Sequence, residues 1–194
     1  SYIDKNMTFS SYIRTQQYLT NIYTLLPEGL TRMDGNAMFD GVTDDAEFAL
    51  QTGDMQSLNT GSWDATTNPD NPWERCYMGI RMACELMENA DNVDLETYRL
   101  DPKLRTEYAH RKKYIRIWKA EARFLRAFFH FELLKRFGPV PIVTTSLNIN
   151  DDYSNVTRPT IDECVNFIVN ECNAAADSLE LQPWRDNTAL GHAT

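Results

Sequence analysis

The chain has 194 residues, of which 42% are hydrophobic and 24% are charged, and its formal net charge at pH 7 is −9. This length and apolar content are enough to form a buried core, which excludes a disordered chain. No run of 18 apolar residues occurs, which excludes a membrane-spanning helix.

The first predicted helix spans residues 10–26, where apolar residues recur at helical spacing and Pro27 then ends the helix. From residue 27 to residue 71 the periodicity disappears, and Gly, Pro, Asp, Asn and Thr predominate. A long stretch without regular structure inside a compact domain indicates a functional surface region. We expect one short helix, across residues 44–51, to interrupt it.

The second predicted helix spans residues 71–89. Asp70 or Asn71 is the expected N-cap, and Pro72 suits the first turn. Apolar residues at helical spacing predict a buried stripe of Trp73, Tyr77, Ile80, Cys84 and Met87.

The third predicted helix begins with Asp101 as N-cap and runs to Phe137. Such a helix would be about 55 Å long, which is longer than a domain of this size is wide. We therefore expect a bend or a projecting end near residues 108–113. Gly138 is expected to adopt positive φ after the last turn, and Pro139 cannot continue the helix.

The second half of this helix has an unusually wide apolar face, which predicts that other elements cover it on two sides. Glu121 and Glu132 point into that face, where an unpaired carboxylate is costly, so both require partners. The apolar face is predicted to contain Ala122, Phe124, Leu125, Phe128, Phe129, Phe131 and Leu133, and the narrow polar face Lys119, Arg123, Arg126 and His130.

Basic residues are concentrated in the same helix. Residues 101–137 hold eleven Lys or Arg against four Asp or Glu. A basic helix is one indication of nucleic-acid binding. The rest of the chain is acidic and would repel phosphate, and the basic side chains can pair with acidic neighbours. We therefore expect intramolecular ion pairs and no nucleic-acid partner.

The last predicted helix begins with a capping box formed by Thr160 and Glu163. Its predicted buried stripe consists of Ile161, Cys164, Val165, Ile168, Cys172, Ala175, Ala176 and Leu179.

The four cysteines form two pairs, Cys76 with Cys84 and Cys164 with Cys172, each eight residues apart within one predicted helix. Eight residues of helix span about 12 Å, which is beyond disulfide reach. We expect free thiols. The alternative is a disulfide bond between the two helices.

The stretch from Trp118 to Val143 resembles the signature of the SusD/RagB family, the surface nutrient-binding lipoproteins of Bacteroidetes. The resemblance rests on Glu121, Ala122, Phe124, Leu125, Arg126, Ala127, Phe131, Leu133, Phe137, Gly138, Val140 and Pro141. Of these, Glu121, Arg126, Gly138 and Pro141 are taken as the structural signature. The final residues Gly191, His192, Ala193 and Thr194 are similar to a family motif that precedes the next core helix.

This resemblance implies an all-α fold of tetratricopeptide-like antiparallel helical hairpins around a central helix, with a long irregular loop. It also implies that residues 1–194 are the N-terminal helical domain of a longer protein, truncated at its C-terminal end. The implied function is binding of an oligosaccharide or polysaccharide and its delivery to a SusC-like TonB-dependent transporter. The implied location is the external face of the outer membrane, with a lipid anchor on a residue upstream of this chain.

Sugar recognition requires flat apolar side chains for stacking, flanked by planar polar groups that bind hydroxyls. The long loop supplies Phe39 and Trp63, with Asp64 and Asn68 beside them, and these four residues are the candidate ligand-binding site. Trp63 is the foremost candidate. The alternative is that these aromatic side chains anchor the loop to the core.

Enzyme motifs are absent from the sequence, and we assign no catalytic residue, metal or cofactor. Asp44 and Asp45 form the most conspicuous carboxylate pair, but a helix cap or a solvent-exposed position explains them better. Glu121 is predicted to have a structural role and not that of a general acid. A second functional hypothesis is a helical-repeat scaffold that binds a peptide or protein in a groove.

Overall fold

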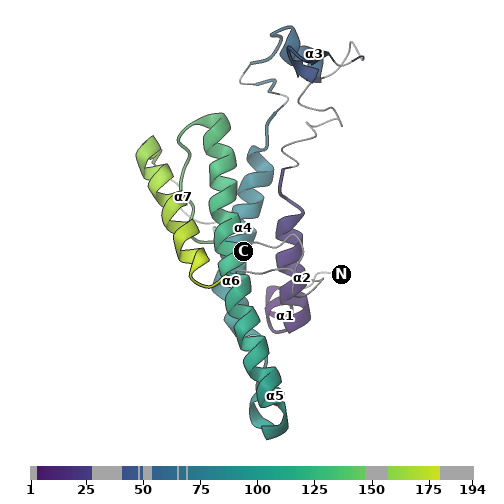
Figure 1. Cartoon of the computed structure of the whole chain (residues 1–194), viewed down its shortest axis with the longest axis vertical. Helices are drawn as coiled ribbons and strands as arrows, with labels where there is room; N and C mark the ends of the chain where they lie inside the picture. The colour runs from purple at the N-terminus through teal and green to yellow at the C-terminus, as the bar shows by residue number, and fades with distance from the viewer. Residues whose placement is uncertain are drawn as a thin grey trace. The chain divides into compact units, whose positions relative to one another are not determined.

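The structure is a computed structural model that describes residues 4–27, 41–47, 49, 54–64, 66–68, 70–146 and 157–179 (Figure 1). The chain divides into two units. The helical unit comprises residues 1–25 and 75–194, and the loop unit comprises residues 26–74. Each unit is described by itself.

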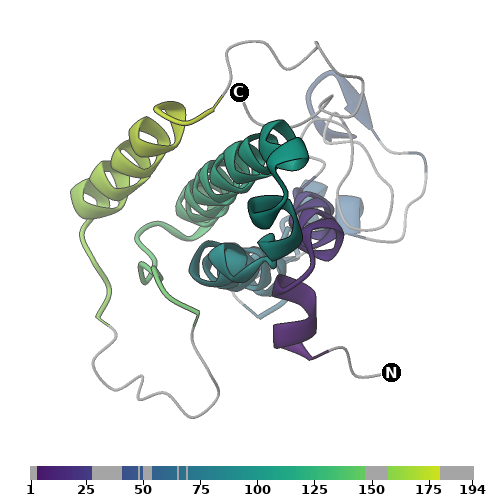
Figure 2. The same ribbon diagram turned by 90° about the horizontal axis from the view of Figure 1, so that it is seen from below.

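The helical unit is built around one long helix, α6. Its helices are α1 (Lys5–Phe9), α2 (Tyr12–Tyr23), α4 (Trp73–Asn89), α5 (Glu96–Leu100), α6 (Arg105–Phe137) and α7 (Ile161–Ala176), with 3-10 turns at Ala90–Asn92 and Pro102–Leu104. Figures 1 and 2 both place α6 between α7 on one side and α2 on the other. Figure 1 also shows that α4 and α7 run antiparallel to α6. The predicted all-α class with a central helix is confirmed.

The core lies where α2 and α4 pack against the apolar face of α6. Gly79 on α4 makes this close approach possible, because a Cβ atom at this position would lie 2.4 Å from the ring of Phe129. The largest fully buried side chains in these helices are Leu19, Ile22, Ile80, Leu86, Leu125, Phe129 and Leu133.

The predicted first helix is interrupted near its start. A separate short helix, α1, precedes α2, and the Ser11 hydroxyl accepts a hydrogen bond from the Arg14 amide at 3.5 Å. This serine therefore caps α2, which explains why the chain turns there instead of continuing one helix.

The helix α6 is continuous from residue 105 to residue 137. Asp101 caps the preceding 3-10 turn, since its carboxylate accepts from the Lys103 amide at 2.9 Å. The first turns of α6 extend past α2 and α7, and α5, which the sequence did not predict, packs beside them (Figure 1). At the other end Gly138 has φ 69°, as expected for a residue that ends a helix at positive φ.

The predicted polar face of α6 is wrong for two residues. Arg126 and His130 are buried, because α7 and the segment after Pro139 cover them. Phe131 was predicted to be buried, but it is 42% exposed.

The capping box of α7 is confirmed, since Thr160 and Glu163 exchange side chain to backbone hydrogen bonds. The predicted buried stripe of this helix is only partly confirmed. Cys164 and Ala175 are buried, whereas Ile161 and Val165 are 58% and 42% exposed. Val169, which was not part of the predicted stripe, is also 49% exposed. The helix therefore presents an apolar stripe to solvent.

The described residues of the loop unit form two short strands, β1 (Val42–Thr43) and β2 (Ala46–Glu47), and one helix, α3 (Asp54–Asn59). The strands form an antiparallel hairpin in which Val42 pairs with Glu47 and Thr43 pairs with Ala46. The expected helix across residues 44–51 is therefore wrong for residues 44–47. Asp44 and Asp45 occupy the exposed turn of the hairpin, so of the two alternatives for this pair the solvent-exposed position is confirmed and the helix cap is wrong.

All four cysteines are free thiols, as predicted, and Cys76, Cys84 and Cys164 are buried. Among the described residues, no helix is both long enough and apolar enough to cross a membrane.

Candidate ligand-binding loop and basic cavity

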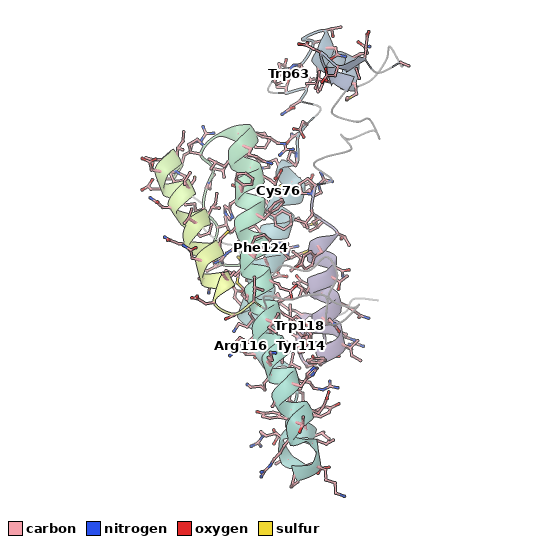
Figure 3. The ribbon with its side chains drawn as sticks, viewed as in Figure 1. Trp63, Cys76, Tyr114, Arg116, Trp118 and Phe124 are labelled. Atoms are coloured by element: carbon pink, nitrogen blue, oxygen red, sulfur yellow. The ribbon has the colours of Figure 1, made fainter. Side chains whose placement is uncertain are left out.

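Trp63 lies in the loop that follows α3, and its side chain is 49% exposed (Figure 3). The loop leaves α3 through Gly61, whose φ of 68° reverses the chain direction. The Ser62 amide donates to the Ser57 carbonyl at 2.8 Å, which ties the residue before Trp63 to α3. A half-exposed indole held next to a fixed backbone is suited to stacking on a flat ligand.

Asp64 fixes the conformation of the residues that follow Trp63. One of its carboxylate oxygens accepts hydrogen bonds from the Thr66 and Thr67 amides at 2.7 and 2.8 Å and from both threonine hydroxyls. These bonds favour the ionised form, so they hold the pKa of Asp64 below its ordinary value, with the Thr66 hydroxyl as the largest contributor. Asp64 therefore orders the loop through its own hydrogen bonds.

Asn68 also forms a local turn, because its side-chain oxygen accepts from the Asp70 amide at 3.0 Å. Asn71 then accepts from the Trp73 amide at 3.2 Å, which agrees with its predicted role at the start of α4. Trp63, Asp64 and Asn68 thus all lie in the segment between α3 and α4, of which the structure describes residues 61–64, 66–68 and 70–71. Phe39 lies outside the described residues.

The residues of the structural signature join elements of the helical unit. Glu121 is 3% exposed, and the Tyr23 hydroxyl donates to its Oε2 at 2.7 Å. The Pro141 carbonyl accepts from the Tyr77 hydroxyl at 3.1 Å. Glu132, the second carboxylate in the apolar face, pairs with Lys135 and Arg136 at 2.5 and 2.6 Å. The buried carboxylates therefore have the partners that the sequence required.

Arg126 joins three segments. Its Nε donates to Glu171 of α7 at 3.0 Å, its Nη1 donates to the Thr144 carbonyl at 2.7 Å, and Cys84 of α4 lies at 3.5 Å. These contacts, all inside the helical unit, give Arg126 a role in packing.

A cavity of about 1060 Å³ lies between the segment 91–99, α6 and the C-terminal end of α7. Its α6 wall carries Lys112, Arg116, Lys119 and Arg123. Sequence reasoning noted the basic character of this helix but not the cavity. The signal was the spacing of four, three and four residues, which puts all four side chains on one face.

The sequence of residues 1–193 matches a SusD-like family whose description is starch-binding and associating with the outer membrane. The chain belongs to this family. The predicted resemblance is therefore confirmed over nearly the whole chain. No curated protein sequence matches the chain.

Solved structures of SusD-like proteins share the fold. A SusD-like carbohydrate-binding protein from Bacteroides fragilis is 20% identical with a TM-score of 0.69, over 96% of this chain and 35% of that one. A laminarin-binding SusD-like protein is 17% identical with a TM-score of 0.68, and the match covers 96% of this chain and 38% of that protein. A SusD homologue from Bacteroides thetaiotaomicron is 18% identical with a TM-score of 0.64, and the match covers 96% of this chain and 34% of that protein.

The chain spans about a third of the length of these structures. Their similarity confirms the tetratricopeptide-like helical fold that the resemblance implied.

Proposed function

We propose that this SusD-like chain binds a neutral oligosaccharide at the loop of residues 61–71, with Trp63 as the stacking residue. The observation that carries the proposal is the half-exposed Trp63 indole beside a turn that Asp64 holds in place. A pre-ordered loop loses little conformational entropy when a ligand binds. The description of the family as starch-binding supports a sugar as the ligand.

The role of the chain is delivery without catalysis. The bound oligosaccharide passes to a SusC-like TonB-dependent transporter, and a lipid anchor upstream of residue 1 holds the protein on the external face of the outer membrane. The family description of association with the outer membrane supports this location. Metal-ligand clusters are absent from the described residues, and no cofactor is assigned.

Titration calorimetry of the full chain with maltohexaose and with laminarihexaose tests the proposal. These two glucans follow from the family description and from the laminarin-binding neighbour. Saturable binding of either sugar supports the proposal. Absence of binding to both sugars and to a panel of other neutral oligosaccharides contradicts it.

A peptide-binding scaffold is the second candidate, and the exposed apolar stripe of Ile161, Val165 and Val169 on α7 favours it. These residues are four apart, which is the spacing that a helical ligand or a hydrophobic peptide contacts. Saturable binding to a peptide library without binding to any oligosaccharide would support this candidate over the first.

A further inference from the structure

Four basic residues of α6, Lys112, Arg116, Lys119 and Arg123, form a stripe along one wall of the cavity in the helical unit. At 1.5 Å per residue the stripe is about 16 Å long. Figure 3 shows Arg116 on the side of α6 opposite Tyr114 and Trp118, the latter of which is buried in the core. The stripe therefore faces away from the core that α2 forms with α6.

The remaining walls of the cavity are mixed, because apolar side chains lie beside the carboxylates of Asp91, Asp94 and Glu96 and beside two further basic residues, Arg99 and Lys113. Its floor includes buried side chains from α6 and from the segment after α4, and Ala174 and Ser178 close it at the end of α7. The buried apolar residues of the floor are Val93, Leu95, Ile115 and Ala120. A basic stripe above an apolar floor has a stronger electric field than the same charges on a flat surface, because the low-dielectric walls focus it.

Only part of the basic stripe is neutralised. Lys119 pairs with Asp91, and Arg123 lies 3.8 Å from Glu171. Within the described part of the chain, Lys112 and Arg116 have no ion-pair partner. Two cations that have no carboxylate partner among the described residues therefore line a concave site, in a chain whose net charge is −9.

We infer that this cavity is a second ligand site, which binds an acidic oligosaccharide through Lys112 and Arg116. The inference rests on the proposed function in one respect, that the protein binds glycans. Carboxylate or sulfate groups of the sugar pair with the two cations. Asp94 and Glu96, which also line the cavity, accept hydrogen bonds from sugar hydroxyls, and Glu96 does so beside its ion pair with Arg99.

The geometry favours a short glycan over other polyanions. A nucleic acid extends beyond a cavity of this size and meets the acidic remainder of the surface. An anionic membrane is flat, whereas the two cations line a concave wall. The C-terminal end of α7, which carries the negative end of the helix dipole, also lines the cavity. It repels anionic groups of a ligand and so favours their binding at α6.

The test compares binding of hexagalacturonate, a sulfated hexasaccharide and maltohexaose to the full chain. The double variant Lys112→Glu/Arg116→Glu is expected to weaken binding of the acidic hexasaccharides at least about 10-fold and to leave maltohexaose binding unchanged. Raising the salt concentration is expected to weaken only the acidic ligands, because salt screens ion pairing. Arg105→Glu is the matched control, because Arg105 is an exposed basic residue of α6 outside the cavity.

Several outcomes would overturn the inference. Unchanged affinity of the double variant for the acidic hexasaccharides excludes this cavity, provided that circular dichroism shows a folded protein. If Lys112→Glu/Arg116→Glu does not fold, the milder double variant Lys112→Ala/Arg116→Ala is used for the same binding measurement. Tighter binding of poly-glutamate or of vesicles with anionic phospholipid assigns the site to another class of ligand. Binding of maltohexaose without binding of either acidic sugar contradicts the inference and leaves the proposed function intact.

Discussion

Arg126 on α6 and Glu171 on α7 form an ion pair in which both side chains are nearly buried, with exposed fractions of 7% and 12%. The pair joins the central helix to the last helix, and Arg126 also donates to the Thr144 carbonyl in the connecting segment. The sequence pattern predicted Arg126 on the narrow polar face of the helix. The pair shows that α7 converts this face of α6 into an interior surface.

Removal of the arginine side chain should therefore be costly. Arg126→Ala leaves the carboxylate of Glu171 buried without its main partner, and we expect the free energy of unfolding to fall by about 3–5 kcal/mol. Urea denaturation measures this change. The matched control is Arg123→Ala, since Arg123 contacts the same carboxylate at 3.8 Å from a more exposed position. It should cost less than about 1 kcal/mol. Equal losses in the two variants would show that burial of the pair is unimportant.

His130 should make the protein sensitive to acid. Its Nδ1 donates to the Arg126 carbonyl at 2.8 Å and its Nε2 accepts from the Val143 amide at 3.2 Å, so the folded protein holds a neutral ring. Burial lowers the pKa of His130 from 6.5 to about 4. Since the unfolded state takes up the proton first, stability is complete above pH 6.5 and falls as the pH drops toward 4, by about 3 kcal/mol.

Urea denaturation between pH 7 and pH 4 tests this dependence. His130→Gln should flatten the decline, because glutamine does not titrate in this range. His110→Gln, at an exposed position on the same helix, should leave the profile of the wild-type protein unchanged. A profile that is equally steep with glutamine at position 130 would assign the acid sensitivity to other groups.

Gly79 should not tolerate alanine, although alanine is the better helix former. The added Cβ would lie 2.4–2.8 Å from three ring atoms of Phe129, which is fully buried, so the ring or the helix would have to shift. We expect a net loss of at least about 1 kcal/mol in thermal or urea denaturation, after the gain in helix propensity. Combining Gly79→Ala with Phe129→Leu should recover part of the loss. If Gly79→Ala alone stabilises the protein, α4 and α6 are less closely packed than described.

Glu121 should contribute to stability and not to ligand binding. The Tyr23 hydroxyl donates to its buried carboxylate, and Tyr23→Phe removes that donor. We expect Tyr23→Phe and Glu121→Gln each to cost about 1–3 kcal/mol of unfolding free energy. The affinity for the oligosaccharide should not change in either variant. A Glu121→Gln protein of normal stability that lost only ligand binding would contradict this assignment.

The features that sequence reasoning placed correctly depend on neighbouring residues. Thr160 and Glu163 form their capping box within one helical turn, and Asn71 accepts from an amide two residues away. Gly138 ends α6 because a chain reversal at that point requires positive φ. The buried Glu121 was also foreseen, because one helical period shows which side chains share a face.

The features that sequence reasoning missed depend on contacts between distant residues. Arg126 is buried only because Glu171 reaches it from a helix 45 residues later. The stripe of Ile161, Val165 and Val169 has the pattern of a buried face, but periodicity does not show whether another element covers it. At the candidate site, the residue types indicated Trp63 and Asp64. The hydrogen bonds that the Thr66 and Thr67 amides donate to Asp64 became apparent only in the structure.

The central claim is that Trp63 provides the stacking surface for an oligosaccharide. Calorimetric titration of the full chain and of Trp63→Ala with the same neutral oligosaccharide tests it most directly. The control variant is Phe131→Ala, which removes an aromatic side chain that is also about half exposed but lies in the helical unit.

We predict that Trp63→Ala weakens binding at least about 10-fold, which corresponds to about 1.4 kcal/mol, at unchanged thermal stability. Phe131→Ala should bind as the wild-type protein does. Equal affinity of Trp63→Ala and the wild-type protein would contradict the claim.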